Sequence, residues 1–349
     1  MTKQQKAGPS PFAPVLAIHG GAGALSRVLL SDKARNEYEE ALRAVLRGGC
    51  RILEAGGTAL DAVTEAVRLL EECPLFNAGR GAVFTSDGGH ELDAAVMDGA
   101  TLCSGAVAGV RTVRNPVLAA RAVMERSQHV LFIGAGAEAY ARGQGLEMVD
   151  PAFFSTAARR EQLERVRRQG ADRVMLDHDA QSAAARDPLS FRASAGSGAG
   201  GPPLDEDRKL GTVGAVALDA RGNLAAATST GGMTNKQPGR VGDSPLIGAG
   251  CYANNHTCAV STTGTGEMFI RMVAAYDVSA QMEYAGAGLA AAAGSVIHDK
   301  LPRIGGQGGL IAVDAAGRVA MPFNTEGMYR GVMRAGQAPS VAIYEGGDA

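Results

Sequence analysis

Apolar residues recur in the first part of the chain at spacings typical of one strand and two helices. The apolar run at residues 15–18 predicts a buried strand, and the His-Gly-Gly-Ala-Gly segment at residues 19–23 predicts a glycine turn after it. Apolar positions then repeat at helical spacing over residues 31–53. A capping box at residues 58–61 predicts a second helix that ends near Glu72. We expect these two helices to pack as neighbours.

Shorter patterns alternate between strand and helix over the next hundred residues. Strand-like segments are found at residues 82–84, 93–97 and 106–110. Pro116 marks the start of a further helix, since proline is favoured in a first helical turn. Residues 159–170 are dominated by Arg, Glu and Gln, which predicts an exposed helix. The first part of the chain therefore mixes α and β structure.

The last part of the chain predicts two hairpins on either side of a long helix. The expected segments are a hairpin of residues 212–218 and 224–228, a helix over residues 267–301, and a hairpin of residues 309–313 and 318–322. Ahead of the first hairpin, the chain is rich in Ala, Ser, Gly and Pro from Asp177 to Pro203. We expect a mobile linker over residues 178–211. No internal repeat is evident.

The composition is that of a globular protein that acts on small molecules. Of 349 residues, 46% are hydrophobic and 20% charged, and the 48 glycines are about twice the average usage of roughly 7%, which predicts many tight turns. The net charge is −2 without a long basic run, so nothing indicates binding to nucleic acid or to an anionic membrane surface. No stretch of 18 apolar residues is present to cross a bilayer.

The cysteines and the N-terminal segment favour a cytoplasmic protein. The five cysteines are an odd, scattered set without a C-x-x-C pair, which argues against a disulfide framework and against a zinc site. We interpret them as reduced thiols. The first residues carry two lysines but run into Pro9, Pro11 and Pro14 without an apolar signal core, so a cytoplasmic location is expected.

Thr212 is a candidate nucleophile. It follows Gly211 at the start of an apolar strand, and a charged segment at residues 204–210 leads into it. A threonine hydroxyl needs a nearby base, and cleavage of the Gly211–Thr212 bond would release an α-amine on the same residue that can act as one. An isolated Gly-Thr pair is more often a β-branched residue that opens a strand, so the pair needs support from its surroundings.

Two segments after Thr212 supply that support. Residues 228–236, Thr-Ser-Thr-Gly-Gly-Met-Thr-Asn-Lys, place hydroxyls and flexible glycines at a strand end, where sites are often built. Arg240 and Asp243 lie close together in a glycine-rich loop. The guanidinium suits an α-carboxylate and the aspartate suits an α-ammonium, so the two fit a zwitterionic amino acid. The alternative is a surface ion pair without a ligand.

A third segment, Ser-Thr-Thr-Gly-Thr-Gly at residues 261–266, precedes the predicted long helix. Its small residues allow backbone N–H groups to point at one place, as in an oxyanion hole. A plain glycine turn and an anion-binding helix start are equally compatible with this segment.

Other enzyme classes lack their signatures. A dinucleotide fingerprint at residues 130–139 fails at its third glycine, which is Ala139. Neither a G-x-S-x-G serine-hydrolase motif nor an H-E-x-x-H metal motif occurs in the chain, and we interpret His19 as structural. A binding protein without activity is the alternative if the chain is never cleaved.

Taken together, residues 211–219, 228–236, 240–245 and 263–266 resemble the plant-type asparaginase and isoaspartyl peptidase family. The resemblance extends to residues 19–23, 71–79 and 322–329, and so covers nearly the whole chain apart from the linker and the termini. It implies an α+β fold, the four-layer αββα sandwich of the N-terminal-nucleophile hydrolases. It also implies self-cleavage into an alpha subunit, residues 1–211, and a beta subunit, residues 212–349, that share one structural domain.

The resemblance assigns an activity and a role to each site residue. The implied reaction is hydrolysis of L-asparagine and of isoaspartyl (β-aspartyl) dipeptides with release of L-aspartate, without an organic cofactor. By resemblance the residues that carry it are Thr212 as nucleophile, Thr230 as its support, Arg240 and Asp243 as holders of the α-carboxylate and α-amine, Thr263 and Gly264 as oxyanion stabilisers in contact with substrate, and Gly266 as a lining of the pocket.

The family also implies an ion, an assembly and one alternative substrate. A structural sodium ion would be held by backbone carbonyls of Leu70, Glu71, Cys73, Phe76, Ala78 and Arg80. The expected assembly is a dimer of cleaved heterodimers. Glycosylasparaginase is the runner-up activity, but it is usual in secreted or lysosomal proteins, whereas this chain favours the cytoplasm. The linker is longer than in the shorter family members, which bears on the rate and completeness of cleavage.

Overall fold

The computed structural model describes residues 12–23, 30–168 and 211–346. The charged segment 204–210 and all of the predicted linker except Gly211 lie outside the described residues. Both residues of the predicted cleavage site, Gly211 and Thr212, lie within the described residues.

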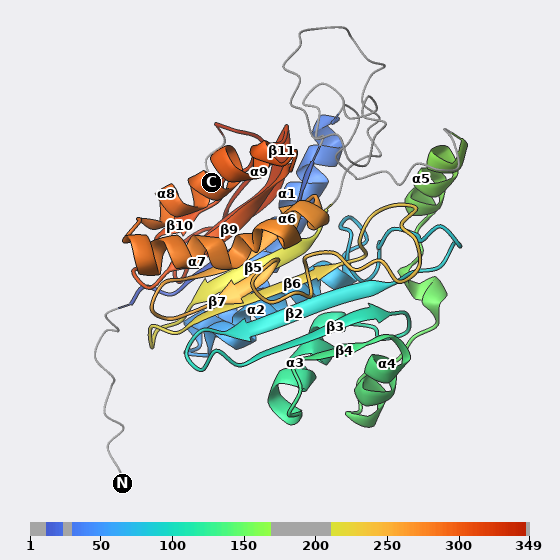
Figure 1. Ribbon diagram of the computed structural model, residues 1–349, viewed down its shortest axis with the longest axis horizontal. Helices are drawn as coiled ribbons and strands as arrows, with labels where there is room; N and C mark the ends of the chain where they lie inside the picture. The colour runs from blue at the N-terminus through green and yellow to red at the C-terminus, as the bar shows by residue number, and fades with distance from the viewer. Residues whose placement is uncertain (1–11, 24–29, 169–210, 347–349) are drawn as a thin grey trace, which may run out of the picture.

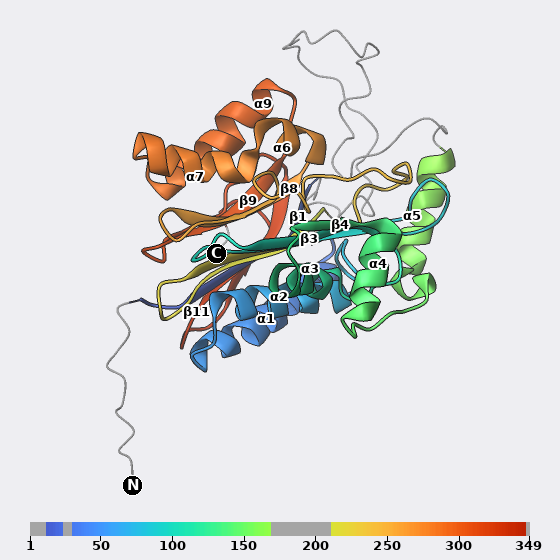
Figure 2. The same ribbon diagram turned by 60° about the horizontal axis from the view of Figure 1, so that its bottom comes forward.

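Two β-sheets lie face to face in the middle of the molecule (Figures 1 and 2). The larger sheet has the order β12 (Ser340–Ala342), β11 (Gly327–Arg334), β1 (Val15–Gly23), β5 (Val213–Leu218), β6 (Leu224–Thr230), β2 (Leu92–Asp98), β3 (Ser104–Val110) and β4 (Leu131–Ile133). The smaller sheet has the order β10 (Val319–Ala320), β9 (Gly308–Asp314), β8 (Cys258–Gly264) and β7 (Cys251–Ala253). Neighbouring strands pair antiparallel except β3 and β4, which are parallel.

Helices cover the outer face of each sheet. The larger sheet is covered by α1 (Asp32–Glu54), α2 (Ala59–Glu72) and α3 (Pro116–Arg126), with α4 (Gly134–Gly143) beside β3 and β4. The smaller sheet is covered by α6 (Gly266–Met272), α7 (Ala274–Ala285), α8 (Leu289–Gly294), the π-helix η3 (Ser295–Lys300) and α9 (Leu301–Arg303). The remaining helices of the described ranges are η1 (Pro151–Phe154) and α5 (Ala157–Arg168). This arrangement confirms the αββα sandwich.

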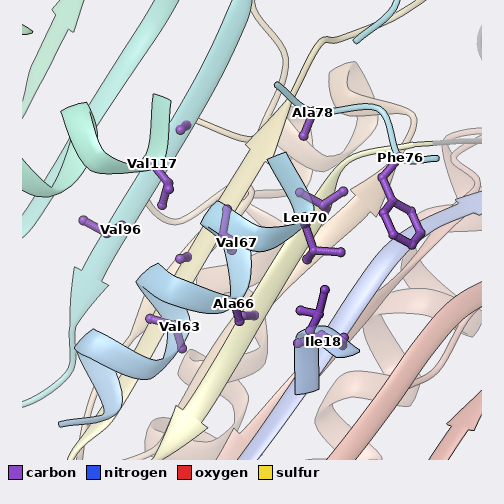
Figure 3. Close-up of a cluster of buried hydrophobic side chains, with 14 of the residues drawn as sticks. Ile18, Val63, Ala66, Val67, Leu70, Phe76, Ala78, Val96 and Val117 are labelled. Atoms are coloured by element: carbon purple, nitrogen blue, oxygen red, sulfur yellow. The ribbon is translucent and has the colours of Figure 1, made fainter. Parts of the chain in front are cut away.

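Strand side chains alternate between two apolar cores, because successive residues of a strand point to opposite faces. On β1, Leu16 and Ile18 pack against the helices, whereas Val15 and Ala17 pack between the two sheets. Figure 3 shows Ile18 close to the α2 side chains of Ala66 and Leu70. A third core lies between the smaller sheet and its helices. Burial on both faces favours apolar residues along a strand, which explains the unbroken hydrophobic runs at residues 15–18 of β1 and along β5.

The helix starts follow their sequence signals. The Thr58 hydroxyl accepts a hydrogen bond from the backbone N–H of Asp61 at 3.0 Å and donates to the Asp61 carboxylate at 2.7 Å, so the predicted cap of α2 is confirmed. Pro116 is the first residue of α3, as predicted. The helix predicted from residue 31 is α1, and the hairpin predicted around residues 219–223 joins β5 to β6.

Several predicted elements are wrong. Residues 19–23 form no turn but continue β1, with an irregular register between His19 and Gly21. Residues 82–84 form no strand. The predicted helix 267–301 is broken after α6 and α7, where Val273 and Gly286 adopt left-handed φ angles of 49° and 64°. Periodicity misses these breaks because both flanking segments are helical.

Two further differences arise from tertiary contacts. Helix α5 is not fully exposed, since Arg159 is 4% exposed and donates from its Nε to the carbonyl of Gly81 at 2.8 Å. Strands β4, β7, β8, β11 and β12 were not predicted. The β8 segment contains four successive polar or glycine residues, Ser261 to Gly264, and such a sequence becomes a buried strand only when other strands satisfy its hydroxyls.

Candidate active site

Thr212 lies between the two sheets at one end of β5. On β5 and β6, the even-numbered residues Val216 and Ala226 belong to the core between the sheets. The same alternation directs Thr212 and Thr230 to that side. Val213 pairs with Ser229 in the antiparallel register, so Thr212 and Thr230 are at the same end of the two strands. Both side chains are buried, with exposures of 6% and 2%.

A small pocket surrounds the Thr212 hydroxyl. It is lined by Gly211, Thr212, Thr230, Gly232, Met233, Arg240, Gly242, Asp243, Ser244 and Gly264. The structure thus brings together five of the residues predicted for catalysis and substrate binding, together with Gly211 of the predicted cleavage site. The free volume is about 20 Å³, which is room for about one water molecule and not for an amino acid. As described, the pocket is therefore too small to hold an amino acid.

Ser244 is a neighbour of the nucleophile that sequence reasoning missed. Its Oγ lies 3.1 Å from the Oγ1 of Thr212, and either hydroxyl can donate. Ser244 directly follows Asp243, so its position beside the substrate-binding loop was the only available signal. The contact orients the Thr212 hydroxyl within the pocket.

Thr230 is held by the glycine turn that follows it. Its Oγ1 accepts a hydrogen bond from the N–H of Gly232 at 2.9 Å. Asn77 was also missed from the sequence. Its side-chain Nδ2 donates to the carbonyl of Gly232 at 2.7 Å, and its backbone carbonyl accepts a hydrogen bond from the N–H of Gly231 at 3.0 Å. A Cβ on Gly231 would lie 2.6 Å from Asn77 Oδ1, so glycine is required for this close approach.

Arg240 and Asp243 lie beside Gly266. The guanidinium of Arg240 donates from Nε to Glu267 Oε1 at 2.9 Å, with Nη2 2.8 Å from the same oxygen. A Cβ on Gly266 would lie 2.9 Å from both Arg240 Nη2 and Asp243 Oδ1. The glycine leaves open the space beside the two charged groups, although Gly266 itself is not among the residues that line the pocket.

Asp243 is a buried carboxylate with one strong partner. It is 2% exposed, and its Oδ2 accepts a hydrogen bond from the Thr262 hydroxyl at 2.7 Å. Burial raises the pKa of Asp243 to about 6, although the Thr262 hydrogen bond and the Arg240 charge oppose the rise. The group is therefore ionised at neutral pH and changes charge close to it.

Thr263 and Gly264 end strand β8 opposite the nucleophile. Gly264 lines the pocket, and a Cβ on it would lie 2.2 Å from the carbonyl of Gln307, which excludes any other residue without a backbone shift. Thr263 is fully buried, and its Oγ1 accepts the N–H of Ala22 on β1 at 3.3 Å. Its hydroxyl proton is not used in that bond, so it can be donated elsewhere.

His19 joins the two sheets behind the nucleophile. Its Nε2 is 2.8 Å from Ser261 Oγ, which is itself 2.8 Å from Thr228 Oγ1. Burial lowers the pKa of His19 to about 3, against the opposing effect of the Thr212 backbone, so the ring is neutral. A neutral buried histidine within a network of hydroxyls fits the structural role interpreted from the sequence.

The predicted sodium ligands begin in the last turn of α2, with Leu70 and Glu71, and continue into the loop after it. Its backbone carbonyls turn inward: a Cβ on Gly81 would lie 2.6 Å from the Pro74 oxygen and 2.8 Å from the Phe76 oxygen. Three of the predicted ligands already accept one hydrogen bond each, namely Leu70 from Cys73, Glu71 from Arg80, and Cys73 from Phe76. A carbonyl has two lone pairs, so these bonds leave capacity for an ion. The loop therefore fits a hard cation held by carbonyl oxygens.

The side chain of Glu71 ties this loop to the site. Its Oε1 accepts hydrogen bonds from Ser229 Oγ at 2.7 Å and from the N–H of Val117 at 2.9 Å. Burial raises the pKa of Glu71 to about 8, against the lowering effect of these bonds. Ser229 precedes Thr230 on β6, so a hydrogen bond connects the end of α2 to the strand that carries Thr230.

Within residues 12–23, 30–168 and 211–346, no group of three His, Cys, Asp or Glu side chains is placed to hold a metal ion. In the same ranges, none of the helices has the length and apolar character needed to cross a membrane.

Comparison with known proteins gives a consistent result. The model of the family described as asparaginase matches residues 12–343. An isoaspartyl peptidase of Escherichia coli is 61% identical over 335 residues, which is 96% of this chain and 97% of that protein. One from Salmonella typhimurium is 60% identical, covering 95% of this chain and 98% of its own. A putative isoaspartyl peptidase/L-asparaginase of Dictyostelium discoideum is 51% identical, covering 91% and 92%. With a match of this extent and a threonine-centred pocket, the chain belongs to the asparaginase family of hydrolases.

Proposed function

We propose that the chain is a threonine hydrolase that releases L-aspartate from isoaspartyl dipeptides and from L-asparagine. The observation that carries the proposal is the pocket in which the Thr212 hydroxyl lies beside Arg240 and Asp243. One hydroxyl nucleophile, one cation and one anion match a substrate with a scissile side-chain amide, an α-carboxylate and an α-ammonium. The relatives named isoaspartyl peptidase support the substrate class.

Activation begins with cleavage of the chain. The Thr212 hydroxyl adds to the carbonyl carbon of Gly211, and breakage of the peptide C–N bond leaves an ester on the Thr212 oxygen. Water hydrolyses the ester to a Gly211 carboxylate and a free Thr212. Cleavage creates the α-amine that serves as base and allows Gly211 to leave the closed pocket. The products are the two subunits 1–211 and 212–349.

Catalysis then uses the same hydroxyl on substrate. Arg240 binds the α-carboxylate and Asp243 the α-ammonium, while Thr230 orients the nucleophile. Attack on the side-chain carbonyl gives a tetrahedral oxyanion, which receives hydrogen bonds from the Thr263 hydroxyl and the Gly264 N–H. Ammonia or an amino acid leaves, and water hydrolyses the β-aspartyl ester. No organic cofactor has a part in this scheme.

We expect Thr212→Ala to abolish both maturation and activity, because it removes the only nucleophile of the scheme. Intact mass under denaturing conditions should show two fragments for the natural sequence, meeting at Gly211 and Thr212, and one 35.7 kDa chain for the variant. Thr212→Ser keeps a hydroxyl and is the control that should still cleave. Ammonia release from L-asparagine and hydrolysis of β-Asp-Leu report activity, and glycosylated asparagine tests the runner-up. A natural chain that stays intact and inactive would require withdrawal of the proposed function.

The acidic side of the pH profile should depend on Asp243. Its carboxylate must be ionised to bind the substrate ammonium, so kcat/KM should fall as the pH drops through about 6. Thr262→Val removes the hydrogen bond that lowers this pKa, and the fall should therefore move to higher pH. Thr257→Val is the control, because Thr257 is a buried threonine bonded to Ser279. Identical profiles for the Thr262 variant and the natural protein would contradict this role of Asp243.

A structural sodium ion in the loop after α2 is part of the proposal. The loop residues that would hold it are those predicted from the sequence, and the ion would stabilise the loop by neutralising converging carbonyl dipoles. Sodium chloride should therefore raise the melting temperature more than choline chloride at equal ionic strength. Gly81→Ala places a Cβ against the Pro74 and Phe76 oxygens and should remove that difference. Equal melting temperatures of the natural protein in the two salts would exclude the ion.

We also propose that two cleaved heterodimers associate. Support comes from the edge strand β4, where Leu131 and Ile133 are 41% and 66% exposed and Val130 before it is 50% exposed. Ile133→Glu should convert the dimer to single heterodimers in analytical ultracentrifugation. Tyr284→Glu, at a side chain 74% exposed on α7, is the matched control and should leave the dimer intact. A natural protein that sediments as one heterodimer at micromolar concentration would contradict the association.

A cytoplasmic location completes the proposal. All five cysteines are free, and Cys50, Cys251 and Cys258 are buried as thiols. Free thiols are usual in a reducing compartment. Fractionation of the source cells tests this, and recovery of the protein outside the cytoplasm would contradict it.

A further inference from the structure

Arg240 is presented by a tight turn with a specific backbone requirement. The N–H of Arg240 donates to the carbonyl of Gln237 at 3.0 Å, and Pro238 and Gly239 occupy the two central positions. Gly239 has a φ of 87°, which is the left-handed value that the third residue of a type II turn needs. The turn itself leaves the N–H of Gly239 without a partner. Another part of the chain must therefore hold it.

Glu91 supplies that partner. Its Oε2 accepts the N–H of Gly239 at 2.7 Å, next to the peptide unit that leads into Arg240. The backbone carbonyl of Glu91 also accepts a hydrogen bond from Lys236 Nζ at 2.8 Å. One residue, just before β2, thus contacts the chain at both Lys236 and Gly239, on either side of the Gln237–Pro238 pair.

These contacts are buried at Glu91 and Lys236, whereas Gly239 in the turn is exposed and its hydrogen bond to Glu91 is partly buried. The Glu91 side chain is 7% exposed, and Lys236 is fully buried. Hydrogen bonds that involve a charged group are stronger than neutral ones, and their loss in a buried place is costly. The backbone of Lys236 is fixed as well, because its carbonyl accepts the N–H of Ser86 at 2.8 Å. The turn and the residue before it are therefore held by contacts from Glu91 and Ser86.

Three charged residues from separate parts of the chain surround Glu91: Arg111 after β3, Lys236 after β6, and Asp93 on β2. Arg111, which is 50% exposed, donates from Nη2 to Glu91 Oε1 at 2.7 Å. Burial lowers the pKa of Lys236 and raises that of Asp93 on β2, while the opposite charges of these two groups counteract both shifts. Glu91 is the carboxylate in this group that contacts the turn directly.

We propose that Glu91 is a positioning residue for substrate binding, which holds the Gln237–Arg240 turn and thereby places the Arg240 guanidinium for a substrate α-carboxylate. The inference rests on the proposed function of Arg240. On its other side the guanidinium meets Glu267, which is 47% exposed and offers less restraint. Release of the turn would displace Arg240 relative to Thr212, and small misplacements of a binding group are costly.

The test is a comparison of KM and kcat in Glu91→Gln. Glutamine has one acceptor oxygen for two donors, so either Gly239 or Arg111 loses its partner. We expect KM for L-asparagine to rise about tenfold, equal to about 1.4 kcal/mol, with kcat within about threefold of the natural protein. Arg111→Gln is the matched control: it removes the other contact of the Glu91 side chain and should leave KM within about twofold.

A second pair of variants separates positioning from general damage. In an Arg240→Lys background the turn no longer presents a guanidinium, so Glu91→Gln should add little further loss in kcat/KM. Equal losses in both backgrounds, or an unchanged KM in Glu91→Gln alone, would overturn the inference while the proposed function stands. An uncleaved and inactive natural protein would overturn both. Intact mass after maturation confirms that each variant folds and cleaves.

Discussion

Strand β5 is covered on both faces, and this double burial determines the position of Thr212. The residues of β5 alternate between the core under α2 and the core between the sheets. A shift of one residue would turn every side chain of the strand to the opposite face, so the register is strongly specified. Thr212 lies just before this strand and inherits its orientation. The position of Thr212, the proposed nucleophile, is therefore fixed by the packing of a central strand.

Around that strand the polar groups form continuous buried networks. His19, Ser261 and Thr228 link three strands of the two sheets, and Asp243 is held by Thr262. Each of these groups would be costly to bury without a partner, and a hydrogen bond offsets the cost of burial in each case. On the opposite face of β6, Ser229 contacts Glu71 and so joins the catalytic strand to the carbonyl-lined loop. The site is therefore supported from both sides of the larger sheet.

The closed pocket and the continuous chain belong to one state of the protein. Gly211 lines the space that substrate needs, and the N–H of Thr212 is still part of a peptide bond. The proposed cleavage of this bond would change both conditions at once. One cleavage would thus both open the pocket to substrate and free the α-amine of Thr212, so no separate lid is required. Gly21 allows the chain at Gly211 to lie close to β1, since a Cβ on Gly21 would lie 2.6 Å from the nitrogen of Gly211.

The sequence by itself determined the local features of this protein. The cap at Thr58, the helix start at Pro116 and the hairpin after Thr212 follow from short-range rules, and the grouping of Arg240 with Asp243 follows from their closeness in the chain. The four layers and the site roles came from family resemblance, which carries information that periodicity lacks. Only the tertiary structure decided the contacts of Ser244, Asn77 and Glu91 and the existence of β8 as a strand. Such contacts join residues as far apart as His19 and Ser261, separated by 242 positions, and no local pattern specifies which distant hydroxyl will satisfy a buried one.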